Sequence, residues 1–347
     1  MPTERPGVAG AALLPLGKPP LELLGRLLGA WKIHDPRVVV GPRLGEDAAI
    51  LDLGDRYLVA TSDPITFTAE DIGWYAVQVN ANDLAVRGAQ PCWFLMTLLL
   101  PEGKTDATLL ERIFGQVQEA CEAVGATIVG GHTEITAGLD RPILAGTMLG
   151  EVAKDRLVTT AGARPGDAIL LSKGIAVEGA SILAREGGKR LAGVPADLVA
   201  RARDFLRSPG ISVLRESRIA LETVPVHAMH DPTEGGLATG LLELAMAGGV
   251  GLEVEAGAIP VLPECAALCG ALGLDPLGLI ASGSLLLACP AERAEALVAA
   301  WGAQGIGGGV IGRILPADAG CWMIDRQGRR PLPRFARDEV ARLLEGC

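Results

Sequence analysis

The chain has 347 residues, of which 49% are hydrophobic and 21% charged, and its formal net charge is −10. This length suffices for two domains with ample cores, and the composition excludes an intrinsically disordered chain. The acidic balance argues against nucleic acid as a partner, because a phosphate backbone requires a basic surface.

Membrane and export signals are not found in the sequence. No apolar run reaches the roughly 20 residues of a membrane span, and the first ten residues lack the basic-then-apolar layout of a signal peptide. Seven cysteines, without a Cys-x-x-Cys pair, are typical of reduced thiols. We therefore expect a cytoplasmic protein that does not bind a membrane.

Residues 1–37 are expected to form a loose lead and one helix. Pro19 and Pro20 open this helix, which spans 21–30, because proline is tolerated in a first turn. Lys18 is expected to be solvated, and a contact with a phosphate is the alternative.

Residues 38–160 mix short strands with two long helices. Strands are predicted at 38–40, 48–51, 57–60, 92–100, 126–129 and 143–149, and helices at 72–87 and 106–124. This order predicts an α+β domain in which helices cover one face of a single sheet. The strand at 92–100 is so uniformly apolar that we expect both of its faces to be buried.

The helix at 72–87 carries three short polar side chains, Asn80, Asn82 and Asp83, in an otherwise apolar stretch. Burying such groups costs free energy unless they have partners, which a cation or a polyphosphate would supply. A solvated outer face of a core helix is an equally good interpretation of this segment alone.

Further polar groups in this half lie at turns or after strand-like runs, where loops often carry function. Glycines and a polar triplet after a strand are a common way to present backbone N–H groups to an anion. Each group alone is also compatible with an ordinary polar loop. The residues concerned are Asp47, Asp63, Gly130, Gly131, His132, Thr133 and Glu134.

A turn cluster at 162–167 predicts the start of a second domain, 161–330. Lys173 follows its first strand, and helices are expected at 177–185 and 196–205. Residues 331–347 are expected to form a C-terminal helix and tail.

The polar run His-Asp-Pro-Thr-Glu-Gly-Gly at 230–236 opens an apolar helix at 237–247. Asp or Thr before a helix caps it, and the free N–H groups there suit an anion. The density of polar residues and glycines favours a binding turn over a plain cap.

Aspartates at strand and helix ends, without a compact cluster of His and Cys, favour Mg²⁺ over zinc. Cys265 and Cys269, four residues apart on a predicted helix, are expected to be core residues. The sequence contains neither a Walker A motif nor a dinucleotide-binding glycine fingerprint. ATP with Mg²⁺ is the ligand that the pattern favours.

Several of these segments, taken in order, resemble the AIR synthase superfamily over about residues 38–315. This group includes aminoimidazole ribonucleotide synthetase, selenophosphate synthetase, thiamine-monophosphate kinase and the hydrogenase-maturation protein HypE. The Asp-Pro-Thr-x-Gly-Gly-Leu-Ala turn is most similar to that of HypE. The segments are Gly45-Glu46-Asp47-Ala48-Ala49, Asp63, Asn82-Asp83-Leu84-Ala85, Gly130-Gly131 and the turn at 231–238.

The resemblance implies an α+β, two-domain fold, with an N-terminal sheet-and-helix domain that dimerises through its sheet and a C-terminal α/β domain. It implies ATP between the domains, an unidentified small-molecule substrate, and Mg²⁺ on Asp47, Asp63 and Asp83. The catalytic residues that it indicates are Asp83, His132 and Asp231. Nucleotide contacts are expected from Asn82, Gly130, Gly131, Thr133, Glu134, Lys173, Thr233, Gly235 and Gly236.

The chain departs from HypE at both ends. HypE proteins have a glycine-rich N-terminal segment and end in Pro-Arg-Ile-Cys, whose cysteine receives a carbamoyl group that ATP helps dehydrate to a thiocyanate. Here residues 14–20 differ and the last residues are Leu-Glu-Gly-Cys. His132, at a position where HypE has Asp, is more like selenophosphate synthetase, but the N-terminal reactive cysteine of that enzyme is absent because the first cysteine is Cys92.

Three functions follow as alternatives. The first is an ATP-dependent enzyme that activates an oxygen of a small substrate by phosphorylation. The second is a HypE-like dehydratase that acts on Cys347, and the third is a nucleotide-binding regulatory protein without turnover. The presence of all three carboxylates favours an enzyme over the regulatory protein. The last residues differ from those of HypE, which favours a Cys347 without a catalytic role and weighs against the second alternative.

Overall fold

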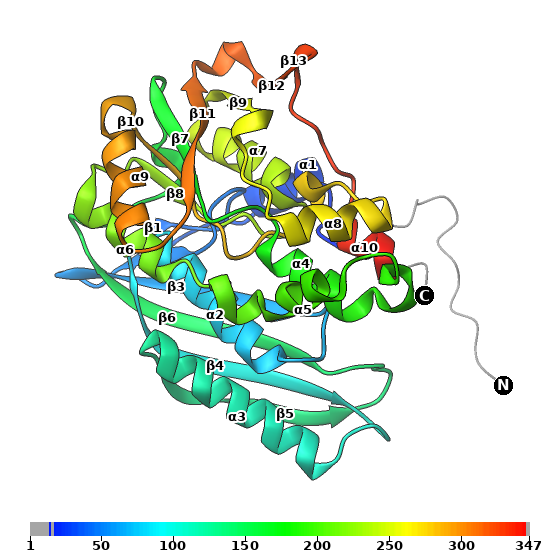
Figure 1. The fold of residues 1–347 in the computed structure, drawn as a ribbon. Helices are drawn as coiled ribbons and strands as arrows, with labels where there is room; N and C mark the ends of the chain where they lie inside the picture. Colours follow the sequence, from blue (N-terminus) through cyan, green and yellow to red (C-terminus); the bar gives the residue numbers. More distant parts are fainter. Residues whose placement is uncertain (1–13, 15–16, 345–347) are drawn as a thin grey trace, which may run out of the picture.

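The computed structural model describes residue 14 and residues 17–344. These residues form two sheets, seen in the lower and upper halves of Figure 1. The first has the strand order β1-β2-β3-β6-β4-β5, and the second has the order β13-β12-β9-β11-β7-β10-β8. The predicted α+β class with a two-domain fold is confirmed.

The first sheet is covered by helices on one face only. Its strands are antiparallel neighbours except β4 and β5, which run parallel because helix α3 crosses over between them. Asp106 caps α3 by accepting a hydrogen bond from the Leu109 N–H at 2.8 Å. The elements are β1 (Val38–Val40), β2 (Ala49–Asp52), β3 (Arg56–Ile65), α2 (Ile72–Ala85), β4 (Gln90–Pro101), α3 (Ala107–Val124), β5 (Thr127–Thr136) and β6 (Ile143–Ala153).

Two strands of this sheet run on through residues that were predicted to lie beyond their ends. Strand β3 runs on through Asp63, which therefore lies inside the strand and not beyond its end. Strand β5 continues through Gly130 and Gly131, so the predicted loop after residue 129 is wrong. At Gly131, with φ +146, a Cβ would lie 2.0 Å from the carbonyl oxygen of Met96, so only glycine allows this pairing with β4.

The face of the first sheet that carries no helix is open in the single chain. Along β4, buried residues alternate with partly exposed ones, and the Trp93 side chain is 37% exposed. The prediction that this strand is buried on both faces is therefore wrong for one chain. An open face with Trp93 on it is available for a partner surface.

The second sheet is covered on both faces, as expected for a C-terminal α/β domain. Helix α7 packs on one face, and α6 and α9 pack on the other. Its strands are β7 (Asp167–Ser172), β8 (Ala228–His230), β9 (Gly251–Glu255), β10 (Leu286–Pro290), β11 (Gly308–Leu315), β12 (Cys321–Asp325) and β13 (Gly328–Pro331). The helices of this half are α4 (Val177–Glu186), α5 (Ala196–Asp204), α6 (Leu214–Thr223), α7 (Gly236–Gly248), α8 (Pro263–Leu272) and α9 (Ala294–Ala303), of which α4, α5 and α8 pack on one another and join the core of the first half.

Two further helices lie at the ends of the described chain, α1 (Leu21–Gly29) and α10 (Glu339–Leu344). Val340 and Leu343 of α10 are buried in the core that α4 also joins. No helix in the described part of the chain is long and apolar enough to cross a membrane. Cys265 and Cys269 are buried core residues, as predicted.

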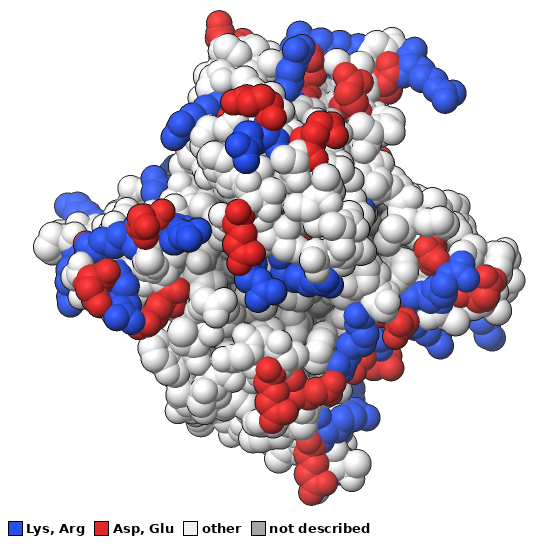
Figure 2. Space-filling view, turned by 60° about the vertical axis from the view of Figure 1, so that its left-hand side comes forward, with Lys and Arg blue, Asp and Glu red and all other residues white. Residues whose placement is uncertain are grey.

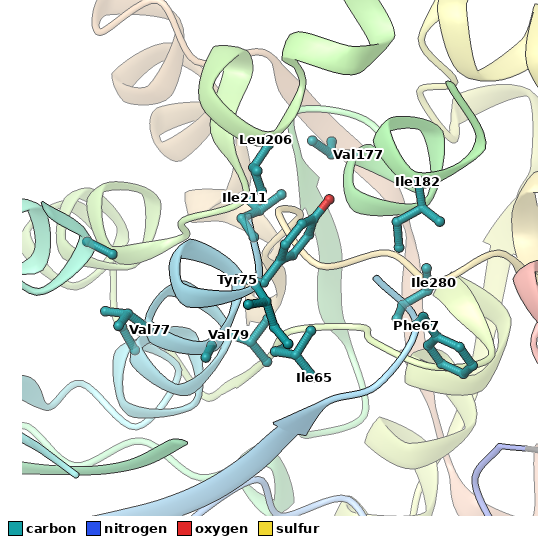
Figure 3. Packing of buried hydrophobic residues seen from close by; sticks show 14 of the residues in the cluster. Ile65, Phe67, Tyr75, Val77, Val79, Val177, Ile182, Leu206, Ile211 and Ile280 are labelled. Carbon is teal, nitrogen blue, oxygen red and sulfur yellow. The ribbon is translucent and has the colours of Figure 1, made fainter. Parts of the chain in front are cut away.

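Helix α2 joins the two halves of the molecule. Figure 3 shows Tyr75 of this helix pointing toward Val177, with Leu206 and Ile211 beside it. The Asn82 side chain donates a hydrogen bond to the carbonyl of Ile211 and accepts one from the Val213 N–H, both at 2.8 Å. A continuous core and an amide bridge therefore hold the halves together.

Arg87, just after α2, makes a second connection. Its guanidinium is fully buried and forms ion pairs with Glu46 at 3.0 Å and Asp47 at 2.5 Å. It also donates to the hydroxyl of Thr160 at 2.7 Å.

On the outer face shown in Figure 2, acidic and basic side chains lie side by side.

Candidate active site

Four aspartates from both halves of the chain converge between the two sheets. Asp47 lies in the loop before β2, Asp63 lies on β3 and Asp83 lies on α2. Asp231 directly follows β8 at the start of the loop that leads into α7. Ligand atoms of Asp47 and Asp231 lie within 4.8 Å of each other, and Asp47, Asp63 and Asp83 line one cavity.

Asp63 and Asp83 are held by neighbouring polar groups. The Thr61 hydroxyl donates a hydrogen bond to Asp83 at 2.5 Å. The Asn80 side chain accepts from the Asp63 N–H at 3.0 Å and donates to the Asp63 carbonyl at 3.2 Å. Burial, followed by the charge of Asp63, raises the pKa of Asp83 well above its usual range.

Asp231 is the least compensated of the four. Its side chain is 1% exposed, and neither carboxylate oxygen has a hydrogen-bond partner among the described residues. Burial, followed by the charge of Asp47, raises the pKa of Asp231 well above its usual range. A buried carboxylate without a partner is costly, so this arrangement fits a bound cation.

Four side chains of alternating charge, Asp47, His230, Glu243 and Lys18, contact one another in a row that we call the charge ladder. His230 contacts Asp47 through Nδ1 at 2.8 Å and Glu243 through Nε2 at 3.0 Å, and Lys18 pairs with Glu243. Burial acts to lower the pKa of His230, but Asp47 and Glu243 outweigh it and raise this pKa to about 10. His230 is therefore a buried imidazolium.

His230 lies within 4.8 Å of Asp47 and Asp231, a grouping compatible with a metal ion. Because both of its ring nitrogens contact carboxylates, His230 does not offer a free lone pair to a metal. The donor set that remains consists of carboxylate oxygens, which suit Mg²⁺. The residues fit this ion, with Asp231 supplying the uncompensated charge.

Two cavities meet at this cluster. The first, of about 220 Å³, is lined by Asp47 and Asp83 together with Arg43. The second, of about 260 Å³, extends toward α4. Lys18, Asp63 and Thr233 line both, so Asp63 is the aspartate that lies where the cavities join.

The turn before α7 lines the site through Thr233, as predicted, but one of its backbone N–H groups is already engaged. Thr233 lines the site, and Gly236 adopts φ +66 where a Cβ would lie 2.5 Å from the Leu277 carbonyl oxygen. The Gly235 N–H, however, donates to the Asp338 carboxylate at 2.7 Å. This donor is therefore not free for an anion, contrary to the expectation for a bare helix start.

Two predicted nucleotide contacts have their polar groups engaged elsewhere. The Lys173 ammonium pairs with Glu216 at 2.8 Å and donates to two backbone carbonyls. The Asn82 amide bridges to residues 211–213. Neither belongs to the described residues that line the two cavities, because their side chains complete internal contacts instead.

His132 and Glu134 point away from the aspartates of the same chain. His132 aligns with Thr97 on β4, and that row continues through Ala145 to Pro64. Adjacent strand residues face opposite sides, so His132 lies on the open face and Asp63 on the helix-covered face. Gly130, Gly131 and Thr133, also on β5, are exposed, and one chain does not bring this segment to the cluster.

Several residues of the site were not found by sequence reasoning. His230 lies in the motif but was not assigned a role, and Arg87 and Glu243 were not singled out as candidates. Lys18, expected to be solvated, pairs with Glu243 and lines both cavities. Their common signal is charge in an apolar context, visible for Glu243 in the helix run Leu-Leu-Glu-Leu.

Comparison with known proteins identifies the family. The model described as AIR synthase related protein, N-terminal domain, matches residues 45–152, and the corresponding C-terminal domain model matches residues 164–320. The chain belongs to the AIR synthase-related family. The resemblance deduced from the motifs is thereby confirmed.

Relatives of this AIR synthase-related chain include proteins named for hydrogenase maturation. A putative hydrogenase expression/formation protein of Methanocaldococcus jannaschii is 33% identical over 72% of this chain and 73% of its own length. Carbamoyl dehydratase HypE of Cupriavidus necator is 36% identical over 74% and 73%. The solved structure of HypE in complex with ATP has a TM-score of 0.69 and 32% identity, covering 87% of this chain and 92% of HypE. The chain is an enzyme of this superfamily, as predicted.

Proposed function

We propose that this protein is an ATP- and Mg²⁺-dependent enzyme that activates an oxygen of a small substrate by phosphoryl transfer. The observation that carries the proposal is the cluster of four aspartates beside two cavities, in which Asp231 has no hydrogen-bond partner among the described residues. The similar HypE structure contains ATP, which supports the choice of nucleotide.

Asp47, Asp63, Asp83 and Asp231 would hold Mg²⁺, which neutralises phosphate charge and orients the transferred group. Unpaired carboxylates would otherwise repel a polyphosphate. Arg87 and His230 keep Asp47 ionised, because their charges outweigh burial and lower its pKa to about 2. Lys18 supplies a cation where the cavities meet.

A second candidate is a HypE-like dehydratase in which Cys347 carries the group being dehydrated. Relatives named carbamoyl dehydratase, at 34% and 36% identity, favour it. Cys347 lies outside the described residues. Helix α10, just before it, is docked by buried Val340 and Leu343 and by Asp338, whose carboxylate accepts three backbone N–H groups. Because these contacts hold α10 in place, this mechanism requires the few residues after α10 to reach the site.

The open face of the first sheet supports a homodimer as the working form. Trp93, Leu95 and Leu99 alternate with buried residues along β4 and present apolar surface on this face. His132 and Glu134 lie on the same face, so a second copy would cover them too. Burying this apolar surface would supply the driving force for association.

The proposal is tested by calorimetric titration of Mg²⁺–ATP into the wild type and Asp83→Asn. Loss of one metal ligand should weaken binding at least tenfold, which corresponds to about 1.4 kcal/mol. Asp140→Asn is the matched control, because the Asp140 side chain is 98% exposed. Equal affinity of wild type and a folded Asp83→Asn would contradict the proposal.

Substrate search uses the wild type with ATP, Mg²⁺ and a metabolite pool, following ADP release. Turnover that depends on an added metabolite supports phosphoryl transfer to a small substrate. Binding of ATP without turnover in any fraction would instead favour a regulatory protein.

A further inference from the structure

The smaller cavity, of about 220 Å³, is lined by a cation that no described acid neutralises. Arg43 lies in the loop between β1 and β2, and its guanidinium makes no ion pair or hydrogen bond with residue 14 or residues 17–344. Lys18, which also lines the cavity, is held by Glu243. The guanidinium of Arg43 is therefore available to a ligand, and its planar fork of N–H donors matches a carboxylate or a phosphate.

Most of the acids around this cavity are already compensated by cations of the protein. The compensated acids are Glu46, Asp47 and Glu243, which pair with Arg87, His230 and Lys18. Asp63 and Asp83 are the lining acids without an ion pair among the described residues, and both belong to the proposed Mg²⁺ site. With this metal bound, Arg43 is the charge that still lacks a counterion among the described lining residues.

The wall beside this guanidinium is aliphatic. Leu24 and Leu28 of α1 and Leu44 line the cavity, and its described lining residues include no aromatic side chain. Leu44 packs directly on α1, since a Cβ at Gly25 would lie 2.8 Å from the Leu44 Cδ1. Pockets for drug-sized ligands have volumes of about 300–1,000 Å³, so this smaller space suits a short aliphatic molecule.

The position of the smaller cavity fits the phosphoryl acceptor. The reacting oxygen of an acceptor must lie about 3–3.5 Å from the transferred group, and hence beside the metal and the nucleotide. Both cavities are lined by Asp63, so a nucleotide in one and an acceptor in the other can meet there. The larger cavity has no arginine among the described residues that line it, whereas the smaller one has Arg43. An anionic acceptor therefore belongs in the smaller cavity.

Resting on the phosphoryl transfer proposed above, we propose that the acceptor is a small aliphatic carboxylate bound in the smaller cavity. Its carboxylate lies on the Arg43 guanidinium, and its chain lies against the leucines of α1. A second oxygen of the same molecule lies toward Asp63 and reacts. A singly charged carboxylate is favoured over a phosphate ester, because the acids that line the cavity would repel a further negative charge more strongly. Arg43 thus determines the specificity for the acceptor.

The assignment is tested with the full-length protein, Mg²⁺, ATP and a metabolite extract split by anion exchange into an unretained and a retained fraction. The retained fraction should stimulate ADP release, before and after treatment with a phosphatase that is then removed, because a phosphatase leaves carboxylates intact. The unretained fraction, which holds neutral and cationic metabolites, should not stimulate it.

Variants of Arg43 separate recognition from reaction. Arg43→Ala should require at least tenfold more of the retained fraction for half-maximal turnover, because a charge-assisted hydrogen bond is lost, with a maximal rate within about twofold of the wild type. Arg43→Lys, which keeps the charge but not the fork, should lie between them. Arg112→Ala, exposed on α3, is the matched control and should behave as the wild type. Calorimetry should give all four proteins the same affinity for Mg²⁺–ATP.

Stimulation by the unretained fraction alone, or its loss from the retained fraction after phosphatase, would overturn the assignment while leaving phosphoryl transfer intact. These wild-type results decide the matter even if a variant does not fold. A folded Arg43→Ala with an unchanged response would overturn it as well. Weaker Mg²⁺–ATP binding by Arg43→Ala would make Arg43 a ligand of the nucleotide and not of the acceptor. If Mg²⁺–ATP binds but no fraction gives turnover, the proposed function fails and this assignment fails with it.

Discussion

Two buried aspartates with opposite surroundings should respond oppositely to the same substitution. Asp231 has no hydrogen-bond partner among the described residues, whereas the Asp338 carboxylate accepts N–H groups of Gly235, Ile280 and Val340 at 2.7, 3.2 and 2.7 Å. Asp231→Asn removes a buried, uncompensated charge without changing volume. Without metal it should stabilise the protein by about 1–3 kcal/mol, the typical cost of leaving a buried polar group unsatisfied.

Asp338→Asn should destabilise by a similar amount. The NH₂ group of asparagine is a donor, so it would face a backbone N–H that now donates to the carboxylate. The hydrogen bond lost at that position, made to a charged acceptor, contributes about 1.5–3 kcal/mol. For domains of 150–250 residues, 1 kcal/mol corresponds to about 2–4 °C in melting temperature.

The assay is thermal unfolding by circular dichroism at pH 7.5, in EDTA and then with Mg²⁺ and ATP. Asp231→Asn should melt above the wild type in EDTA and lose most of the stabilisation that Mg²⁺ and ATP give the wild type. Asp338→Asn should melt lower in EDTA yet still be stabilised by the ligands. Shifts of the same sign in EDTA would refute the reasoning from hydrogen-bond partners.

Three further outcomes follow from the structure. Cys347→Ala, or deletion of residues 346 and 347, should leave ATP turnover intact; loss of turnover with retained ATP binding would replace the small-substrate reaction by the HypE-like one. Burial raises the pKa of Glu178 from 4.5 to about 7, so the folded state holds its proton more tightly than the unfolded state. The stability of the wild type relative to Glu178→Gln should therefore fall by roughly 3 kcal/mol between pH 4.5 and 7 and stay constant above, and a flat difference in urea unfolding would contradict this. Light scattering at micromolar concentration should give a dimer for the wild type and a monomer for Trp93→Glu, and a wild-type monomer would count against the sheet-mediated dimer.

Three aspartates of the site could be predicted because each belongs to a short motif. Asp47, Asp83 and Asp231 lie in runs whose residue types and order are diagnostic together, and the structure brings them to one place. The segment around His132 was misread for a local reason, because two consecutive glycines after a strand usually indicate a turn. Here they continue the strand, since β4 approaches too closely for any side chain at Gly131.

The charge ladder could not be predicted, because its contacts join residues far apart in the chain. His230 and Asp47 are 183 positions apart, and Lys18 and Glu243 are 225 apart. Sequence periodicity reports which face of an element is buried, but not which buried charge meets which. Asn82 and Lys173 were predicted to bind the nucleotide, whereas their partners are backbone groups of the protein. The sequence alone does not distinguish these two kinds of partner for a buried polar side chain.

Helix α2 and the residues directly after it are fixed to the second half of the molecule at two points. Asn82 bonds residues 211–213, and Arg87 donates to the Thr160 hydroxyl, which in turn donates to the Met229 carbonyl of β8. A single attachment would act as a pivot, but two attachments more than one helical turn apart block rotation about either. Asp83 lies between them, and Asp231 belongs to the half to which the helix is fixed. These attachments therefore set the spacing of the two carboxylates, and a movement of the first sheet relative to the second half would leave that spacing unchanged. A Mg²⁺ ion held by Asp83 and Asp231, as proposed, would keep this pair of ligands during such a movement.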